Sequence, residues 1–525
     1  MTSATGIWQL VRLQWRTTRG LLLVAPVLLA GLVCAVAGGI AKLYPAAEQR
    51  AVYRETMGAS PAAAAFNGRG HDLDTLGGIA AYEVGFMGQL AIPLIGLLMA
   101  VRLTRRLEDS GILELVTSGR IARTAVPLAA ALSCALAWLL FGGLGVAGLA
   151  AQDFPLSGSA RYLLILGLSG IGFSTLGLVL AQVASSSRTA TSAGLVAILV
   201  FFLGRAVVDG LDLRLTWLSP LGWVAEAHPW GRWQWWPVIA FVVKSLAGVG
   251  LAALVCARRD LGSGMFPQRL GSATARAALA SPWGLAWRLC GGGLLGWLLG
   301  TLVWSGAIGA MSQEFVDAVQ ANPSLAQAFG GDARHLSTVM GLLCCSLMAT
   351  SAGLNVVLRL GTEEASARTG LLAAGRPPRS RWWLAFTGLG LAATAVTLLG
   401  SSAALGLTQW QVMDSRASLD DATRAGVELL APCLALVALG ALLVAAVPRW
   451  RAAVWLPVAW ALVVGLLGEP LRLPEWARDL SPLHWVGQLP VESANATAIW
   501  ILAVGCVLGL GVGLAGYQRR DLLRG

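Results

Sequence analysis

Lysine, charged residues and long polar stretches are all scarce in this sequence of 525 residues. Charged residues make up 12% of the chain against 56% hydrophobic residues, and the mean hydropathy is +0.69. A chain this apolar lies outside the range of soluble proteins. The 64 glycines follow no Gly-X-Y period, which excludes collagen, and small residues are common in membrane helices. The composition therefore predicts a polytopic membrane protein.

The scarcity of lysine excludes one class of nucleotide site. A Walker A loop needs Gly-Lys before Ser or Thr. Only two lysines occur, and they follow Ala41 and Val243, as Lys42 and Lys244. The sequence therefore carries no P-loop, and we expect this chain to hydrolyse no ATP and to hold no cofactor.

Catalytic and metal-binding patterns are missing as well. The eight cysteines all lie within or at the edge of apolar stretches, which argues against disulfides and thiolate metal sites. The four histidines are scattered, and neither HExxH nor GxSxG occurs. We therefore expect no catalytic residues and no metal.

Long apolar runs supply the fold. A transmembrane helix needs about 20 mostly apolar residues. Twelve stretches qualify, and they lie near residues 20–41, 79–101, 125–151, 162–184, 190–208, 237–257, 286–310, 336–358, 383–407, 425–447, 452–468 and 497–516. The sequence thus predicts an all-α membrane protein with about twelve spans.

The basic residues predict the orientation of these spans. With both termini in the cytoplasm, the inner segments hold 24 of the 38 basic residues and the outer segments hold 14. This asymmetry follows the positive-inside rule. The net charge of +11 is spread over many short loops facing lipid headgroups, so we expect contact with lipid and none with nucleic acid.

Short motifs recur at about half the chain length. Leu218–Trp223 recurs as Leu480–Trp485, Arg258-Arg259-Asp260 recurs as Arg519-Arg520-Asp521, and Gly119-Arg120 recurs as Gly375-Arg376, which places Glu108 opposite Glu364. Two six-span halves would form a parallel repeat with a pseudo-two-fold axis along the membrane normal and a substrate path between them. Coincidence in an apolar sequence is the alternative. We divide the chain into a first half at 1–262, a linker at 263–282 and a second half at 283–525.

Each half is expected to begin with a helix in the membrane interface. Trp8, Val11 and Trp15 have helical spacing, with arginines on another face. The second half has a counterpart at Trp283, Leu285, Ala286, Trp287 and Leu289. A simple interfacial anchor without a role in coupling is the alternative.

The loop between the second and third spans combines acidic and apolar residues on the side where basic residues are expected. Residues 102–123 begin with arginines, pass through an acidic amphipathic turn and stop at Gly119. Glu108, Gly111 or Ile112, and Leu115 follow helical spacing, which predicts a short helix that could dock on a soluble partner.

This loop resembles the coupling segment of bacterial ATP-binding-cassette export permeases. In that family the loop has two acidic residues, a Gly, then Glu-Leu and an Arg; the matching residues here are Glu108, Asp109, Gly111, Glu114, Leu115 and Arg123. The whole chain is similar to fused permeases of polyketide antibiotics and other drugs. The resemblance implies a coupling helix resting on a separate ATPase, present in two copies and holding Mg-ATP. It also implies a bacterial cytoplasmic membrane.

The second half departs from this pattern. It keeps the acidic pair Glu363 and Glu364 and has Leu371, but Ala367 stands where the first half has Gly111, and Gly370 where it has Glu114. Coupling through the two halves is therefore expected to be unequal. The alternative is that Glu108 and Glu364 pair with neighbouring arginines such as Arg105 and Arg368, which is compatible with docking.

Polar residues within the spans are candidates for a substrate path, because they are costly there. Lys244 lies about two turns into the sixth span and needs a carboxylate, carbonyl or water partner; the candidate acids are Glu83, Asp209 and Glu428. A structural pair and a contact to cargo or protons both remain open. Gln89 and Asn355 are weaker candidates.

Tryptophans gather in the outer segment before the sixth span, which holds six of the 22. An aromatic belt at the membrane surface explains them. Prolines interrupt any continuous helix there, so short pieces could close the outer end of a pathway. The candidates for such a gate are Pro220, Trp223, Pro482 and Trp485.

The sequence thus favours the permease subunit of an ATP-driven exporter of small amphipathic molecules, working by alternating access. An ion-gradient-driven secondary transporter is the main alternative, and it would need intramembrane carboxylates on a coupling path. A membrane enzyme or assembly factor is a second alternative, although no catalytic cluster is visible.

Overall fold

The computed structural model describes residues 4–113, 121–259, 264–265, 274, 277–313, 316–317, 333–365, 378–467 and 473–520. All regular secondary structure in these ranges is helical. Eleven helices in the described part are long and apolar enough to cross a membrane. The predicted class, an all-α polytopic membrane protein, is therefore confirmed.

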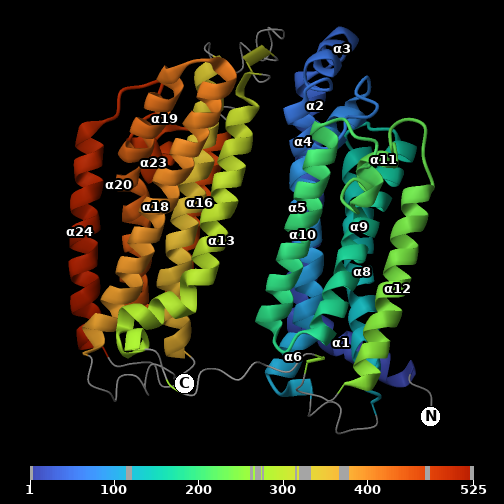
Figure 1. The fold of residues 1–525 in the computed structure, drawn as a ribbon, viewed down its shortest axis with the longest axis horizontal. Coiled ribbons are helices and arrows are strands. Elements are labelled where there is room, and N and C mark those ends of the chain that lie inside the picture. Colours follow the sequence, from blue (N-terminus) through green and yellow to red (C-terminus); the bar gives the residue numbers. More distant parts are fainter. Residues whose placement is uncertain are drawn as a thin grey trace. The chain divides into compact units, whose positions relative to one another are not determined.

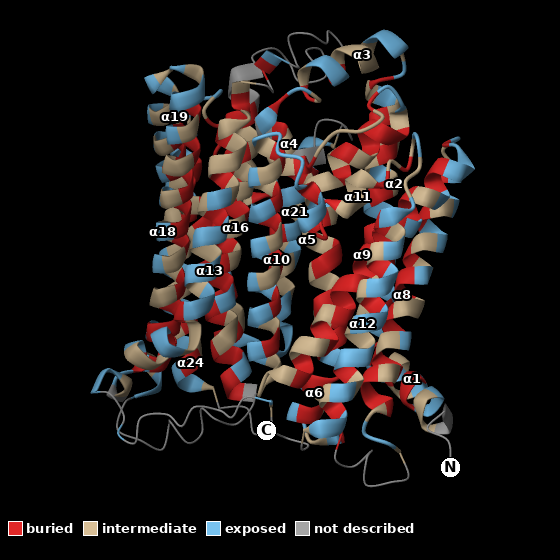
Figure 2. Ribbon diagram, turned by 45° about the vertical axis from the view of Figure 1, so that its right-hand side comes forward, coloured by how far each residue is buried: buried red, intermediate tan, exposed pale blue. Residues whose placement is uncertain are grey.

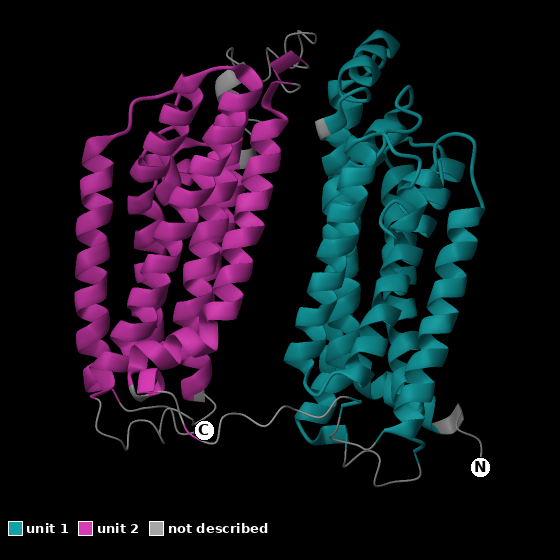
Figure 3. Cartoon of the chain, in the orientation of Figure 1, with its two compact units in different colours: residues 1–271 teal, residues 272–525 magenta. Residues whose placement is uncertain are grey.

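The chain divides into two compact units, Met1–Gly271 and Ser272–Gly525 (Figure 3). Unit 1 contains α1 (Ala4–Arg19), η1 (Gly20–Val24), α2 (Ala25–Leu43), α3 (Ala47–Thr56), α4 (Pro61–Asn67), α5 (Leu76–Leu103), α6 (Arg105–Asp109), α8 (Ala125–Ala150), α9 (Leu156–Val183), α10 (Ser187–Gly210), η2 (Thr216–Leu218), α11 (Trp223–Glu226) and α12 (Trp236–Arg258). Within unit 1, α1 and α6 lie at one end of the bundle and α3 and α11 at the other (Figure 1).

Unit 2 is built in the same way from long helices joined by short ones (Figure 1). It contains η3 (Ala277–Ala280), α13 (Pro282–Ala310), α16 (Ala333–Ala365), α18 (Arg379–Met413), α19 (Arg416–Glu428), α20 (Leu430–Ala446), η4 (Pro448–Val454), α21 (Trp455–Leu467), α22 (Glu475–Arg478), α23 (Pro482–Trp485) and α24 (Ala496–Arg519).

The expected span at 452–468 differs from the other eleven. Its first residues belong to η4, and α21 has 13 residues up to Leu467. At about 1.5 Å per residue, such a helix is about 20 Å long and falls short of a hydrocarbon core of about 30 Å. Residues 468–472 lie outside the described part, so α21 is a short apolar helix as far as it is described.

The starts of the two units differ. In unit 1 the helical path bends at Thr18, where φ is −124° and ψ is 17°, and a π-helical turn then leads into α2. In unit 2 the residues expected as a second interfacial helix, 283–289, are the first turns of α13. Ser281 caps this helix by accepting from the Gly284 amide, and Pro282 occupies its first turn. Because this cap starts the helix at 282, the segment continues directly into the span.

Close packing of the spans relies on small residues. A side chain at Gly96 would meet the Gly170 carbonyl of α9 at 2.6 Å, and one at Gly353 would meet the Gly390 carbonyl of α18 at 2.7 Å. Glycine is therefore required where α5 meets α9 and where α16 meets α18. The peripheral helices α12 and α24 instead expose apolar side chains such as Leu246 and Val507, as lipid contact requires (Figure 2).

Candidate functional site

The predicted coupling segment of unit 1 is held by a buried cluster of charges. Glu108 lies in the short helix α6, directly after the α5 span. Arg259, at the end of α12, donates to both of its carboxylate oxygens at 2.7 and 2.6 Å. Arg105 approaches the same carboxylate at 3.1 Å, and both Arg105 and Glu108 are buried. The segment is thereby fixed to the ends of two membrane helices.

A similar ion pair closes the same end of unit 2. Arg520, after α24, donates to Glu364 of α16 at 2.6 Å, and Glu364 is fully buried. The neighbouring Glu363 pairs with Arg359 one turn earlier at 2.5 Å. The pairs Glu108–Arg259 and Glu364–Arg520 therefore join residues that the sequence repeat had matched separately. It had set Glu108 opposite Glu364, and Arg259 opposite Arg520.

The remaining coupling candidates are placed differently. Asp109 accepts from the Ser187 amide at the start of α10, at 2.8 Å. Gly111 has a φ of +74°, which favours glycine, and the side chain of Ile112 after it is 44% exposed. Glu114, Leu115 and Leu371 lie outside the described residues. Contact of this segment with an ATPase stays a prediction.

The N-terminal helix α1 supports the same end of unit 1. Leu10 and Val11 pack against the start of α8 and against Leu113. The amide of Gln14 donates to the Leu103 carbonyl at the end of α5. Ser133 of α8 donates to the Gln14 side-chain oxygen at 2.7 Å. A displacement of α6 would therefore also be transmitted to α1 and α8.

Lys244 uses a backbone carbonyl as its partner. Its ammonium group donates to the Gly172 carbonyl of α9 at 2.7 Å and lies 4.9 Å from the centre of the Phe173 ring. The three acids considered as its partners have other contacts. Glu83 accepts from the Tyr53 hydroxyl, and Glu428 pairs with Arg424 at 3.1 Å.

Asp209, the third candidate acid, belongs to a buried network at the α11 end of unit 1. Arg205 donates to Asp209 at 3.2 Å and to the carbonyls of Ala65 and Phe66, which end α4. Thr216 donates to the other carboxylate oxygen at 2.7 Å. This network holds α4 against α10. Asn355 is exposed and donates within α16, to the Ser351 carbonyl.

The predicted gate residues form local turns. The indole N–H of Trp223 donates to the Trp217 carbonyl at 2.7 Å, and that of Trp485 donates to the Asp479 carbonyl at 2.6 Å. In both units the bond closes a turn of seven residues. Pro220 lies within the first turn and is buried, and Pro482 within the second is half-buried. A gating role stays a prediction.

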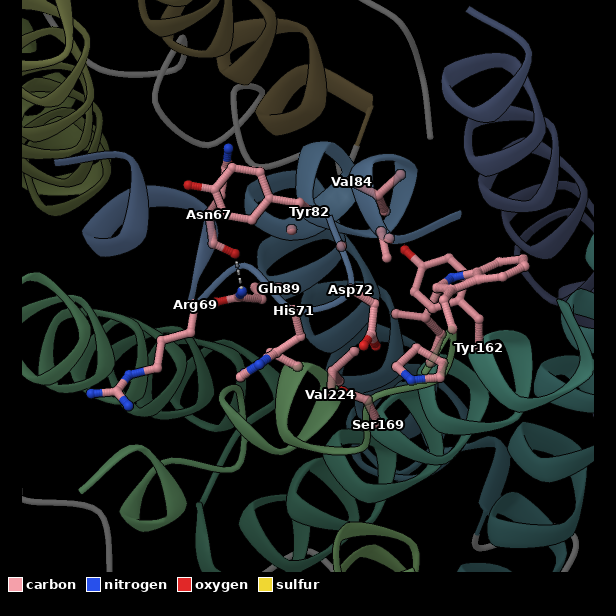
Figure 4. Close-up of a pocket in the computed structure, with 18 of the residues that line it drawn as sticks. Asn67, Arg69, His71, Asp72, Tyr82, Val84, Gln89, Tyr162, Ser169 and Val224 are labelled. Carbon is pink, nitrogen blue, oxygen red and sulfur yellow. Dashed lines mark hydrogen bonds between the residues drawn. The ribbon is translucent and has the colours of Figure 1, made fainter. Parts of the chain in front are cut away.

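A pocket lies at this end of unit 1, between the loop before α5, the α5 and α9 spans and the loop after α11 (Figure 4). Gln89, a predicted path residue, lines it and donates to the Asn67 carbonyl at 2.8 Å. Tyr82 and Tyr162 supply aromatic walls. An apolar wall with a few polar groups is typical of small-molecule sites.

Two histidines with acidic neighbours lie beside this pocket, and one of them, His71, lines it together with Asp72. The rings of His71 and His228 lie 3.9 Å apart between centroids. Burial, then His228 and Arg69, lower the pKa of His71 to about 4, so this ring is uncharged at neutral pH. Burial raises the pKa of Asp72 and of Glu226.

Sequence reasoning missed this cluster. Its members come from two loops more than 150 positions apart, and no local spacing joins them. A weak signal existed, because all four histidines fall in loops that the predicted topology places outside, and His228 lies within the tryptophan-rich segment. The pairing itself required the fold.

Comparisons with known proteins show which proteins this chain resembles. Residues 279–518 match the family model described as the C-terminal domain of the multidrug efflux system permease Rv1217c. Over 533 aligned residues the chain is 29% identical to the multidrug efflux system permease protein Rv1217c of Mycobacterium tuberculosis. The alignment covers 99% of this chain and 95% of that relative. The resemblance to multidrug exporter permeases is therefore confirmed.

Proposed function

We propose that this multi-pass membrane protein is the permease subunit of an ATP-driven efflux transporter. The observation that carries the proposal is its similarity to a multidrug efflux permease along nearly the whole of both chains. The exported molecules would be amphipathic and drug-like, with polyketide-type antibiotics as the class suggested by the resemblance. The site would be the bacterial cytoplasmic membrane, with both termini inside.

In this proposal, two copies of a separate ATPase bind Mg-ATP and move the ends of the spans. The buried ion pairs support it, because Glu108 ties α6 to the end of α12 and Glu364 ties α16 to the residue after α24. A force applied at this end would move two spans of a unit together. Glu108 and Glu364 would thus be positioning residues, while the contact surface would include Asp109, Gly111, Ile112 and the residues that follow.

We further propose that the two units form a parallel internal repeat, with a pseudo-two-fold axis and the substrate path between the halves. The matched ion pairs favour this relation, and so do the matched tryptophan turns. Matched polar contacts at both ends of a helical bundle would be an unusual coincidence in an apolar sequence.

The ion-gradient-driven alternative has less support among the described residues. A proton or sodium relay needs intramembrane carboxylates along a path. Asp209 is engaged by Arg205 and Thr216, and Glu428 lies in a pair with Arg424, whose side chain is exposed. Lys244 bonds a carbonyl.

The test is co-purification of the ATPase. The full-length protein is solubilised from its native host as wild type and as Ile112→Glu, which places a charge on the exposed apolar side chain beside Gly111. Met265→Glu is the matched control, because Met265 is also an exposed apolar residue and its amide donates to the Val183 carbonyl at the same end of unit 1. We expect an ATPase with the wild type and the control, and its loss with Ile112→Glu.

A transport assay separates the two energy sources. Inverted membrane vesicles carrying the wild type should accumulate an amphipathic dye when ATP is supplied, and a protonophore should leave this uptake intact. Uptake abolished by the protonophore, together with a well-folded wild type that brings down no ATPase, would replace the proposal with the gradient-driven transporter.

A further inference from the structure

The histidine pair beside this pocket has the composition of a metal site. His71, Glu226 and His228 each offer a ligand atom, and these atoms all lie within 4.8 Å of one another. The Nε2 atom of His71 is 3.9 Å from a carboxylate oxygen of Glu226. In a tetrahedral zinc site with bonds of about 2.0–2.1 Å, ligand atoms are about 3.4 Å apart. To reach that geometry, the separations between ligand atoms would have to shorten by up to about 1.4 Å.

Polar atoms in the cluster are buried and lack a hydrogen-bond partner among the described residues. They are Nε2 of His71 and one carboxylate oxygen of Asp72. Unpaired buried polar atoms are rare in folded proteins and call for an explanation such as an ion. A metal bound by Nε2 of His71 would satisfy that atom.

The backbone brings these residues together at a conformational cost. Asp72 has a φ of 57° and His228 a φ of 48°, in the left-handed region. The carboxylate of Asp72 lies so close to Gly231 that a β-carbon there would meet it at 1.9 Å. Unfavourable backbone conformations persist where the surroundings enforce them, and they gather at functional sites.

We propose that His71, His228 and Glu226 bind a divalent transition-metal ion of the zinc class. Two imidazoles and one carboxylate are the ligand types that zinc prefers, and a fourth position stays open for water or another ligand. Nδ1 of His228 lies 4.0 Å from Asp72, which leaves Nε2 of this ring for the metal. Asp72 would have to move closer to Nδ1 to reach hydrogen-bond distance, and it would then be the carboxylate that orients a metal-binding histidine.

The charge balance of the site suits a cation. Arg69 is the nearest described arginine, and it is engaged by Asp209 at 3.6 Å and Asp212 at 2.8 Å. Glu226 and Asp72 supply two carboxyl groups beside the two rings. Figure 4 shows the Arg69 side chain extending away from His71 and Asp72.

The ligands are particular to unit 1. The sequence match that pairs Trp223 with Trp485 sets Glu226 opposite Gln488 and His228 opposite Pro490. The turn closed by the tryptophan also forms in unit 2, where these side chains are absent. The two ligands therefore are not needed to build the turn, which favours a role in binding.

Such an ion would join two loops beside the pocket. His71 and Asp72 belong to the loop before α5, while Glu226 ends α11 and His228 follows it. Binding would hold α5 and the segment before α12 together at the end of unit 1 opposite α6. The site stands on its own geometry and does not require that export be driven by ATP.

Metal binding is tested on the full-length protein, purified through a tag without histidine and treated with a chelator. Zn²⁺ is titrated by calorimetry, and Co²⁺ is added as a spectroscopic probe. We expect one Zn²⁺ per chain and, with Co²⁺, the visible absorption of a tetrahedral complex. The Co²⁺ spectrum of the wild type needs no variant, so a folding defect in a variant cannot obscure it.

Variants then assign the ligands. His71→Gln and His228→Asn should weaken Zn²⁺ binding by more than about 100-fold, and Asp72→Asn by about 10–100-fold, as expected for an orienting partner. Asparagine is chosen at 72 and 228 because it tolerates a positive φ. His484→Gln, at the half-exposed histidine of α23, is the control and should bind as the wild type does. A wild type that binds no Zn²⁺, or folded His71 and His228 variants that bind it unchanged, would overturn the proposal.

Discussion

The ion pair between Glu108 and Arg259 should be among the most costly polar contacts to break in unit 1. The Glu108 side chain is 3% exposed and that of Arg259 is 7% exposed. Removing one partner of a buried pair costs about 3–5 kcal/mol, because the other charge stays buried. We therefore expect Glu108→Gln, which takes the carboxylate from both Arg259 and Arg105, to lower the free energy of unfolding by several kcal/mol. Arg259→Gln should cost less, because Arg105 still pairs with Glu108.

The double variant Glu108→Gln with Arg259→Gln measures the interaction energy of the pair apart from the effects of the single substitutions. In the double variant Arg259 no longer adds a buried charge that has lost Glu108, although Arg105 still has lost it. The double loss should therefore be smaller than the sum of the single losses by at least about 1 kcal/mol. Unfolding in mixed micelles with increasing SDS measures these free energies. Glu428→Gln is the control, because its partner Arg424 is 75% exposed, and such pairs contribute about 0.3–0.5 kcal/mol. Additive single losses, or a Glu108→Gln loss no larger than that of Glu428→Gln, would refute the reasoning.

Four further substitutions test other contacts with the same SDS titration. Arg205→Met should cost about 3–5 kcal/mol, because it removes the buried partner of Asp209, which keeps only Arg69 at 3.6 Å, and the bonds of Arg205 to α4; a loss below 1 kcal/mol would contradict this. Lys244→Met should be tolerated within about 1.5 kcal/mol, since the ammonium bonds one carbonyl and its stem lies in an apolar span; a full loss of transport with intact stability would identify Lys244 as a cargo contact. Trp223→Phe and Trp485→Phe should each cost about 1 kcal/mol for the lost indole bond, and unequal losses would argue against equivalent turns.

Much of the fold could be predicted from the sequence, because long apolar runs have few alternatives in a membrane. Eleven of the twelve predicted spans correspond to helices that are long enough to cross, with ends shifted by several residues. The shifts arise at caps such as Thr75, which starts α5 three residues before the predicted boundary by accepting from the Gly78 amide. The predicted span at 452–468 differs from the structure because hydropathy does not distinguish an α-helix from the η4 turn that occupies its first residues.

The partners of polar residues were harder to predict, because they come from segments far apart in the chain. Lys244 had a carbonyl among its expected partners, but nothing local indicates Gly172, which lies 72 positions earlier. The arginine partner expected for Glu108 was Arg105, which is present, whereas Arg259 is 151 positions away. Sequence comparison between the halves had matched both ends of that pair without revealing that they touch.

Differences between the two units argue that the halves have unequal tasks. Glu108 accepts two hydrogen bonds from Arg259 and also pairs with Arg105, whereas one hydrogen bond from Arg520 reaches Glu364 among the described contacts. The metal ligands proposed for unit 1 likewise have no match of the same type in the corresponding turn of unit 2. A bundle of long helices forms in both units, so a bundle of this kind can form without these extra contacts. The segment around Glu108 in unit 1 would therefore be held more firmly than the segment around Glu364 in unit 2. The same force applied to both segments would move the spans of unit 1 further.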